Sequence, residues 1–311
     1  MFEFLKKQAY SIGVDMQDDN LCLIQLAQQS KETILLAGSS ESRPGYIEPG
    51  TVQWQRWAID AIKDIVGKTK FSGKNTIAAI PPTDVFIDHI KMPSVKDGQK
   101  THDAILTKIK PKLPFDAAGA LLKFIPTEED NCMVIATDRT KVDRHLAIFE
   151  KAGLQIKSLS VWPDALARSY VRFFGRRKTD LDAAVLLIDI GPNCTNMVIC
   201  RHKNLLFAKS FPLGAAYVEQ QQDTERLILE IGNSVRHFSS MYKKASVERI
   251  IFLSGKAADV AVYTAIAKKL DMPAQLGDCM AAIKIPDPQN MAVDRRGCNF
   301  SWATAFGLSL S

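Results

Sequence analysis

Short apolar runs separated by polar turns open the chain. Residues 10–16, 21–28 and 32–38 are apolar or alternating, and the polar stretches QDDN and QQSKE separate them, which predicts a three-stranded meander. Over residues 51–66, apolar side chains recur at helical spacing behind Thr51, a suitable N-cap. The apolar run TIAAI follows this helix and predicts a buried strand that pairs in parallel with the meander.

A segment with a different pattern of apolar and polar residues follows the prolines of IPPTD. It contains the alternating run VFIDHIKM, a Lys-rich helix, the apolar runs LLKFI and CMVIAT, a helix over residues 141–152 and the strand LQIKSLSV. We interpret residues 84–158 as an inserted α+β subdomain. Pro163 suits a first helical turn, so a helix over residues 162–174 is expected to return the chain to the first lobe.

The opening pattern recurs after Ala183 as AVLLIDI, NMVIC and LLFAKSF, separated by the turns GPNCT and RHKN. An amphipathic helix, the strand RIIFLSG, a second helix and a short strand follow, and a final helix over residues 302–310 is expected to pack on this second lobe. Asp15 and Asp189 end corresponding strands of the two meanders. The chain is therefore predicted to be a duplicated β-β-β-α-β unit with a cleft between its copies, residues 1–178 and 179–311.

Composition excludes several classes of protein. The 311 residues, 46% of them hydrophobic, exceed what one core usually serves, so two lobes are expected. No apolar run approaches the roughly 18 residues of a membrane-spanning helix, and a cytoplasmic protein is expected. The six cysteines include no C-x-x-C pair, and the five histidines show no metal-ligand spacing, so neither a zinc site nor a disulfide framework is indicated.

The net charge of +6 is too mild and too dispersed to indicate nucleic-acid binding. Basic residues nevertheless gather in two places. One cluster is Lys96, Lys100, Lys108, Lys110 and Lys112, and the other is Arg172, Arg176, Arg177 and Lys178. A solvated face explains either cluster, and contact with anionic lipid headgroups is the alternative.

Several stretches resemble one family. They are FLKKQAYSIGVDMQDDNLCLIQL, KPKLPFDAAGALLKFIP, VIATDRTKVDRHLAIFEKAGLQIKSLSVWPDALAR, LLIDIGPNCTNMVICRHKNLLFAKSFPLG, IIFLSG and ATAFGLSLS. Together they resemble PilM, the FtsA-like component of type IV pilus assembly. The resemblance implies an α/β fold of two RNase H-like lobes, as in actin-like ATPases, with an FtsA-type subdomain inserted.

The resemblance also implies a function. Family members act at the cytoplasmic face of the inner membrane, bind the cytosolic tail of a PilN-like protein and couple it to other pilus platform components and the motor ATPase. Self-association is a further possibility that this resemblance raises. The protein is then an assembly scaffold that reaches the membrane through its partner.

In the actin-like fold, two hairpin turns hold nucleotide phosphates, and two strand-end aspartates position Mg²⁺. The resemblance assigns Asp15 and Asp189 to magnesium, Gly191 and Thr195 to the second turn, and Ser254 and Gly255 to the adenosine loop. ATP and Mg²⁺ are thus the cofactors that it implies, and it implies no other metal.

Departures from the family pattern argue against catalysis. The first turn reads MQDDN, with no glycine and two extra carboxylates, and Pro192 removes a backbone N–H from the second turn. Lys256 replaces a glycine of the adenosine loop. The chain also runs from Gly214 almost directly into the next helix, so the outer subdomain of the second lobe is expected to be missing. We infer lost ATPase activity and no catalytic residue, while nucleotide binding stays open.

A partner tail is expected between the first lobe and the inserted subdomain, where an exposed strand edge can add a strand from a partner. The residues assigned to this groove are Val85, Phe86, Ile87, Leu113, Pro114 and Phe115. The alternative is that the LPF segment packs on its own subdomain.

Two rival functions remain. In one, the chain is a working ATP switch or kinase-like phosphotransferase in which Asp15 and Asp189 hold Mg²⁺ and Asp18 or Asp19 acts on water. In the other, it is a type II secretion component related to GspL, which shares the actin-like lobes but normally continues into a membrane helix.

Overall fold

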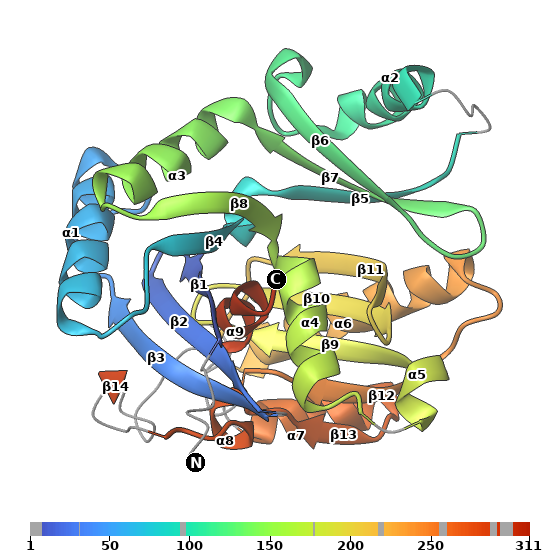
Figure 1. The fold of residues 1–311 in the computed structure, drawn as a ribbon. Helices are drawn as coiled ribbons and strands as arrows, with labels where there is room; N and C mark the ends of the chain where they lie inside the picture. The colour runs from blue at the N-terminus through green and yellow to red at the C-terminus, as the bar shows by residue number, and fades with distance from the viewer. Residues whose placement is uncertain are drawn as a thin grey trace.

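The computed structural model describes residues 8–30, 32–93, 98–176, 178–216, 221–254, 260–286, 291–292 and 301–311. Two mixed sheets with helices form two lobes, and a smaller sheet lies beside them (Figure 1). None of the helices in the described ranges has the length and apolar character needed to span a bilayer.

The first-lobe sheet has the strand order β14-β3-β2-β1-β4-β8. Its strands are β1 (Gln8–Met16), β2 (Asn20–Gln29), β3 (Glu32–Ser42), β4 (Asn75–Ile80), β8 (Gln155–Val161) and β14 (Met291–Ala292). The first three pair antiparallel, as the meander predicts, and β4 pairs in parallel with both β1 and β8. The predicted parallel crossover is confirmed.

Helices cover both faces of this sheet. Alternation along β1 sends Ile12 and Val14 to a core beneath α1 (Val52–Lys68) and α3 (Arg139–Lys151), whereas Gly13 faces α9 (Ala303–Ser309). Thr51 caps α1 as predicted, because its hydroxyl accepts the backbone N–H of Trp54 at 3.2 Å.

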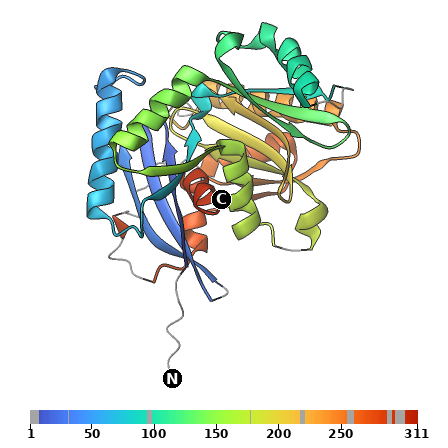
Figure 2. The ribbon, with the colours of Figure 1, turned by 45° about the horizontal axis from the view of Figure 1, so that its top comes forward.

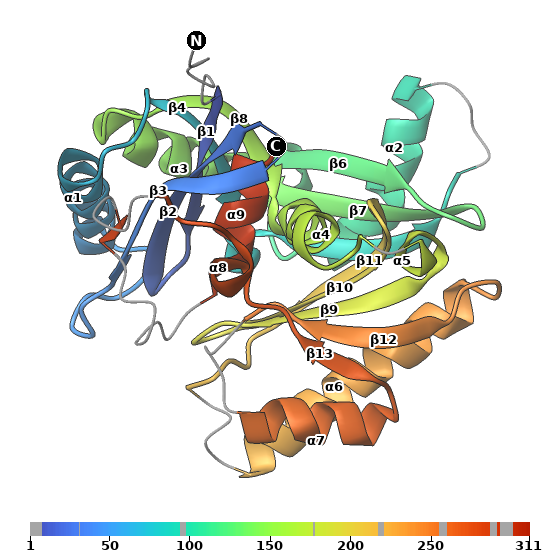
Figure 3. The same cartoon turned by 60° about the horizontal axis from the view of Figure 1, so that its bottom comes forward.

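The second-lobe sheet repeats this topology with the order β11-β10-β9-β12-β13. Its strands are β9 (Ala184–Ile190), β10 (Thr195–Arg201), β11 (Asn204–Phe211), β12 (Val247–Phe252) and β13 (Ala274–Leu276). Figure 3 shows α6 (Gln221–Met241) and α7 (Val260–Leu270) side by side on its outer face. Antiparallel pairs come first and parallel pairs follow, which confirms the predicted duplication.

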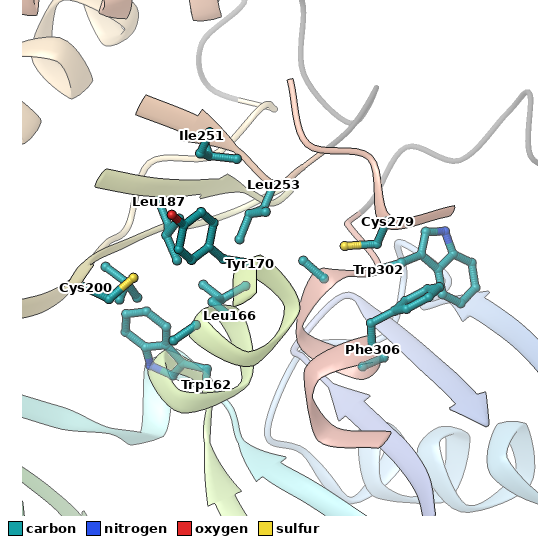
Figure 4. Close-up of a cluster of buried hydrophobic side chains, with 14 of the residues drawn as sticks. Trp162, Leu166, Tyr170, Leu187, Cys200, Ile251, Leu253, Cys279, Trp302 and Phe306 are labelled. Carbon is teal, nitrogen blue, oxygen red and sulfur yellow. The ribbon is translucent and has the colours of Figure 1, made fainter. Parts of the chain in front are cut away.

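The helix α4 (Trp162–Phe173) lies between the two lobes (Figure 4). Its buried side chains Leu166 and Tyr170 join one apolar cluster with Leu187 of the second sheet and Phe306 of α9. The short helices α5 (Thr179–Asp182) and α8 (Cys279–Ala282) complete the second lobe. A shared core therefore joins the lobes.

The final helix α9 packs on the first lobe, against β1 and α4, so the prediction that it packs on the second lobe is wrong. Glycines allow the close approach: a Cβ at Gly307 would overlap the carbonyl of Ala165, and one at Gly13 would overlap the carbonyl of Ala305. Two segments that precede α9 in the chain also pair with β3 in parallel: Lys284 forms an isolated β-bridge with Ile34, and β14 adds a short strand.

The inserted subdomain is smaller than predicted. Its sheet has the order β5-β7-β6, built from β5 (Phe86–Lys91), β6 (Ala120–Pro126) and β7 (Asn131–Asp138), and its helix is α2 (Gly98–Ile109). Single 3-10 turns lie at η1 (Pro82–Asp84), η2 (Lys110–Lys112) and η3 (Ala117–Gly119). The predicted range of 84–158 is wrong at its end, because β8 pairs with β4 and α3 packs under α1 in the first lobe.

Figures 1 and 2 show the inserted sheet beside β11 of the second lobe as well as above the first lobe. In the second lobe, β11 ends at Phe211 and α6 begins at Gln221, so residues 212–220 alone connect them.

Candidate functional site

Two buried carboxylates mark the predicted cleft. Asp15 lies near the end of β1 and Asp189 near the end of β9, and they are 4% and 2% exposed. Each strand leads into a hairpin turn, and the two turns face each other across the lobes. The duplicated topology thus brings together two aspartates that are far apart in the sequence.

Side chains of the two turns are in direct contact. The amide nitrogen of Gln17 donates to Asp15 Oδ2 at 3.0 Å, and its Oε1 lies 4.0 Å from Cys194 Sγ of the other turn. Asn193 Nδ2 donates to Asp19 Oδ2 at 2.8 Å. The space between the turns, where a phosphate chain would lie, is therefore occupied by Gln17 and crossed by an inter-lobe hydrogen bond.

Burial in this cleft disfavours the ionised form of its carboxyl groups. It raises the pKa of Asp15 to about 7, against the hydrogen bond from Gln17 and with further rises from the charges of Asp189 and Asp19. Burial also raises the pKa of Asp189 to about 6, although a hydrogen bond from Ser301 opposes this. The pKa values of Asp18 and Asp19 are raised in the same direction by burial.

The backbone of the second turn is also engaged. The N–H of Gly191 donates to the carbonyl of Cys194 at 2.8 Å, and the carbonyls of Gly191 and Pro192 accept from Ala215 and Ala216 at 2.8 and 2.9 Å. A Cβ at Gly214 would overlap the carbonyl of Pro192, so the segment of residues 214–216 packs tightly on the second turn. The second turn thus commits the N–H of Gly191 and the carbonyls of Gly191 and Pro192 to its own structure.

The hydroxyl groups of the other residues assigned to the nucleotide form hydrogen bonds with the protein backbone. Thr195 Oγ1 donates to the carbonyl of Leu213 at 2.6 Å, and Ser254 Oγ accepts the N–H of Ile190 at 2.6 Å. Gly255 lies outside the described residues. The structure therefore brings Asp15, Asp189 and the second turn together, but it commits both hydroxyls to backbone groups.

The residues present do not fit a polyphosphate. A phosphate cradle needs free backbone N–H groups and positive potential, whereas this cleft offers four carboxylates, and the N–H groups of Gln17 and Gly191 already donate within their own turns. One feature fits a cation: Asp189 Oδ1 is buried and accepts no hydrogen bond from the described residues. Within those ranges, no three His, Cys, Asp or Glu side chains gather as a metal site.

The predicted groove residues lie on opposite faces of the inserted sheet. Phe86, Leu113 and Phe115 pack around the α2 core, whereas Val85 and Ile87 pack against the inter-lobe core. Pro114 is exposed. Since neighbouring residues of a strand point to opposite faces, these six side chains cannot line one groove. Leu113 and Phe115 pack on their own subdomain, as the alternative expected.

Contacts between the inserted subdomain and the second lobe were not foreseen. The ring of His89 stacks on Phe207 with centroids 4.1 Å apart, and its Nε2 lies 2.9 Å from the carbonyl of Ala208. Burial lowers the pKa of His89 to about 4, so this ring is neutral. No local sequence pattern signals such a contact, because β5 and β11 are distant in the chain.

The β6–β7 turn forms a second contact between the inserted subdomain and the second lobe. Both carboxylate oxygens of Glu129 accept backbone N–H groups, from Lys243 at 2.9 Å and from Lys244 at 2.8 Å. The hydroxyls of Thr127 and Tyr242 lie 2.7 Å apart. The inserted subdomain is therefore attached to the second lobe both along β5 and at the β6–β7 turn.

Asp84 attaches the root of the subdomain to the first lobe. Its carboxylate lies 3.0 Å from Lys141, 3.2 Å from Arg144 and 2.9 Å from His145, all on α3. Burial alone would raise the pKa of Asp84, but hydrogen bonds from His145 and Lys141 lower it to about 2. The carboxylate therefore stays ionised and links η1 to α3.

Two lobes of one repeated topology, facing each other through paired strand-end aspartates, define the actin-like ATPase fold. A family model described as type IV pilus assembly protein PilM matches residues 13–224. The chain belongs to this PilM family. A comparison with curated protein sequences gave no match.

Solved structures share the fold. A structure described as the PilM-PilN type IV pilus biogenesis complex is 19% identical, with a TM-score of 0.77 over 97% of this chain and 98% of that chain. The ethanolamine utilization protein EutJ from Carboxydothermus hydrogenoformans is 13% identical, with a TM-score of 0.53 over 97% and 89%. The cytoplasmic domain of EpsL, from the type II secretion system of Vibrio cholerae, is 10% identical, with a TM-score of 0.51 over 96% and 92%.

Proposed function

We propose that this protein is a scaffold of type IV pilus assembly that works with little or no ATP turnover. It acts at the cytoplasmic face of the inner membrane and binds the cytosolic tail of a PilN-like protein. Membership of the PilM family supports the pilus role, and the similar structure of a PilM-PilN complex supports the partner. The position of Gln17 between the hairpin turns carries the inference of lost turnover.

Phosphoryl transfer relies on positioning and on groups that stabilise developing negative charge. The cleft instead places negative charge near the phosphate position, since Asp18 and Asp19 lie in the first turn. In the second turn, Pro192 has no N–H to donate. Gln17 satisfies Asp15 with a neutral donor. These features favour a cleft that is stable without nucleotide.

The attachment of the inserted subdomain also supports a scaffold. Opening of the lobes would strain the contacts of His89 with β11 and of Glu129 with residues 243–244, besides those of Asp84 with α3. A partner bound to this subdomain would thus meet one fixed arrangement of the lobes. The motor ATPase, other platform components and further copies of the chain are additional proposed partners.

A working Mg²⁺-ATP switch is the second candidate, and one observation favours it. Asp189 Oδ1 is buried and no described residue donates a hydrogen bond to it, and Asp15 shares the cleft, so the two carboxylates resemble an incomplete cation site. A bound cation would stabilise both ionised groups. A secretion role like that of EpsL rests on a shared fold alone.

Calorimetric titration with a non-hydrolysable ATP analogue and Mg²⁺ separates scaffold from switch. We expect no heat of binding for the wild-type chain, and none for Gln17→Ala, because the four carboxylates and Pro192 remain in the cleft after that side chain is removed. Micromolar binding together with an ATPase rate that Asp189→Ala abolishes would establish the switch and reject the scaffold.

The partner is tested with a fluorescent peptide of a PilN-like cytosolic tail. Of the six residues predicted to contact the tail, Pro114 alone is exposed, and it lies next to apolar side chains beneath α2, so it is the one tested. Pro114→Glu should weaken binding by about tenfold, whereas Pro126→Glu, the same exchange at the exposed end of β6, should not. Equal loss in both variants would place the tail elsewhere, and no binding by the wild type would reject this partner.

A further inference from the structure

A hollow of about 650 Å³ opens beside α4, and neither of the paired aspartates lines it. Its apolar part is formed by Ala167, Val171 and Leu310. Its cationic part is formed by Arg172, Arg176 and Lys203. The hollow therefore joins an apolar surface to a cluster of positive charge.

This positive charge is not balanced within the described residues. Arg168, which also lines the hollow, pairs with Asp164 at 2.9 Å and uses the carboxylate of the lining. Arg172, Arg176 and Lys203 form no ion pair with any described residue. The buried Nε of Arg172 has no acceptor among the described residues, and burial together with the neighbouring Arg176 lowers the pKa of Arg172.

The fold holds the two guanidinium groups in place. Arg172 donates to the hydroxyl of Thr33, from the first lobe. Arg176 lies one turn further on and donates from Nε to the carbonyl of Arg172 at 2.6 Å, at the C-terminal end of α4. Because neither side chain must be ordered when an anion arrives, the pair loses little conformational entropy on binding.

Guanidinium forks match the oxygens of a phosphate group, and Lys203 adds a further point charge. A free phosphate ion would leave the apolar part of the hollow unfilled, since cavities of this size accommodate drug-sized molecules. A peptide would bring N–H groups that need acceptors, and Asp164, the one carboxylate among the described lining residues, is already paired with Arg168. A phosphodiester with an apolar continuation fits both parts.

We propose that this hollow binds the headgroup of an anionic phospholipid, with the phosphate on Arg172 and Arg176 and the glycerol ester against Val171 and Leu310. The scaffold then contacts the membrane directly, in addition to any tail of a membrane partner. This inference does not rest on the state of the nucleotide cleft.

Co-sedimentation with vesicles tests the proposal. The full chain should bind phosphatidylcholine vesicles containing phosphatidylglycerol and should not bind phosphatidylcholine alone. Arg176→Glu with Lys203→Glu should weaken binding by at least about tenfold. The matched control, Lys63→Glu with Lys70→Glu, makes the same charge change at exposed positions elsewhere and should stay within about twofold of the wild type.

A charge-conserving variant tests the pocket itself. Arg172→Lys should weaken vesicle binding by roughly threefold or more, because it keeps the charge and loses the fork. Circular dichroism checks that each variant is folded. Equal effects of both double variants, an unchanged Arg172→Lys, or absence of binding to anionic vesicles would overturn the proposal. It would also be overturned if a soluble acidic peptide, and not vesicles, bound with the same dependence on these residues.

Discussion

The side-chain amide of Gln17 donates a 3.0 Å hydrogen bond to Asp15 Oδ2, and the same side chain reaches Cys194 of the opposite lobe. A neutral donor thus stands beside a buried carboxylate that a cation would otherwise neutralise. One amide does not compensate for burial, because the pKa of Asp15 still rises to about 7. Keeping Asp15 ionised in the cleft therefore lowers the free energy of unfolding, and the size of this effect depends on pH.

This effect predicts a loss of stability as pH rises. The pKa of Asp15 is about 7 in the folded protein, against the ordinary value of 3.8 expected in the unfolded chain, so between these values the native state holds a proton that the unfolded chain has released. The free energy of unfolding then falls with increasing pH. Asp15→Asn should gain on the order of 2 kcal/mol relative to the wild type between pH 5 and pH 7, measured by urea denaturation.

Asp60→Asn, on an exposed position of α1, is the matched control and should follow the wild-type curve. If Asp15→Asn and the wild type kept a constant difference across this range, Asp15 would be ionised throughout. That outcome would indicate a cation or an unrecognised donor in the cleft.

His89 should act in the opposite direction over an overlapping range. Its pKa of about 4 in the folded protein lies below the ordinary histidine value of 6.5, so between these values the unfolded chain binds a proton that the native state does not. Stability from this group rises between pH 4 and pH 6.5. Relative to His89→Gln, the wild type should gain about 2–3 kcal/mol over this interval. His102→Gln, at an exposed histidine, should show no such change in difference.

The close approach of α9 makes Gly307 intolerant of any side chain. A Cβ there would overlap backbone atoms of Ala165, which cannot move without shifting α4. Gly307→Ala should reduce the free energy of unfolding by roughly 3 kcal/mol or more. Gly67→Ala, in α1 with open space around it, should instead stabilise by about 0.5–1 kcal/mol in the same denaturation series. Similar effects at both sites would contradict the packing described.

Glu129 predicts a local change in hydrogen exchange. Glu129→Gln keeps the size of the side chain but replaces one acceptor oxygen by a donor, so the amide of Lys243 or Lys244 loses its partner. Exchange at that amide, and in the β6–β7 hairpin, should accelerate by about fivefold or more. Glu248→Gln, an exposed exchange near the start of β12, should leave these amides unaffected. Unchanged exchange in Glu129→Gln would mean that this contact does not hold the hairpin.

Much of the cleft was predictable because strand ends and turns leave local signals. The alternation of β1 and the apolar run of β9 placed Asp15 and Asp189 at equivalent strand ends, and MQDDN showed an unusual turn. The role of Gln17 was not predictable, since it depends on how closely the second turn approaches. Val85 and Phe86 show the same limit, because strand alternation sent these neighbours into different cores.

By itself, the sequence determined the elements, the duplicated meander and the paired aspartates, because periodicity and turn chemistry act between residues close in the chain. Only the tertiary structure decided that α9 crosses to the first lobe, that β8 joins β4, and that the inserted sheet fastens to β11. Such contacts depend on which surfaces can approach without overlap or unpaired polar groups. A glycine such as Gly307 permits that approach, but only the structure names its partner.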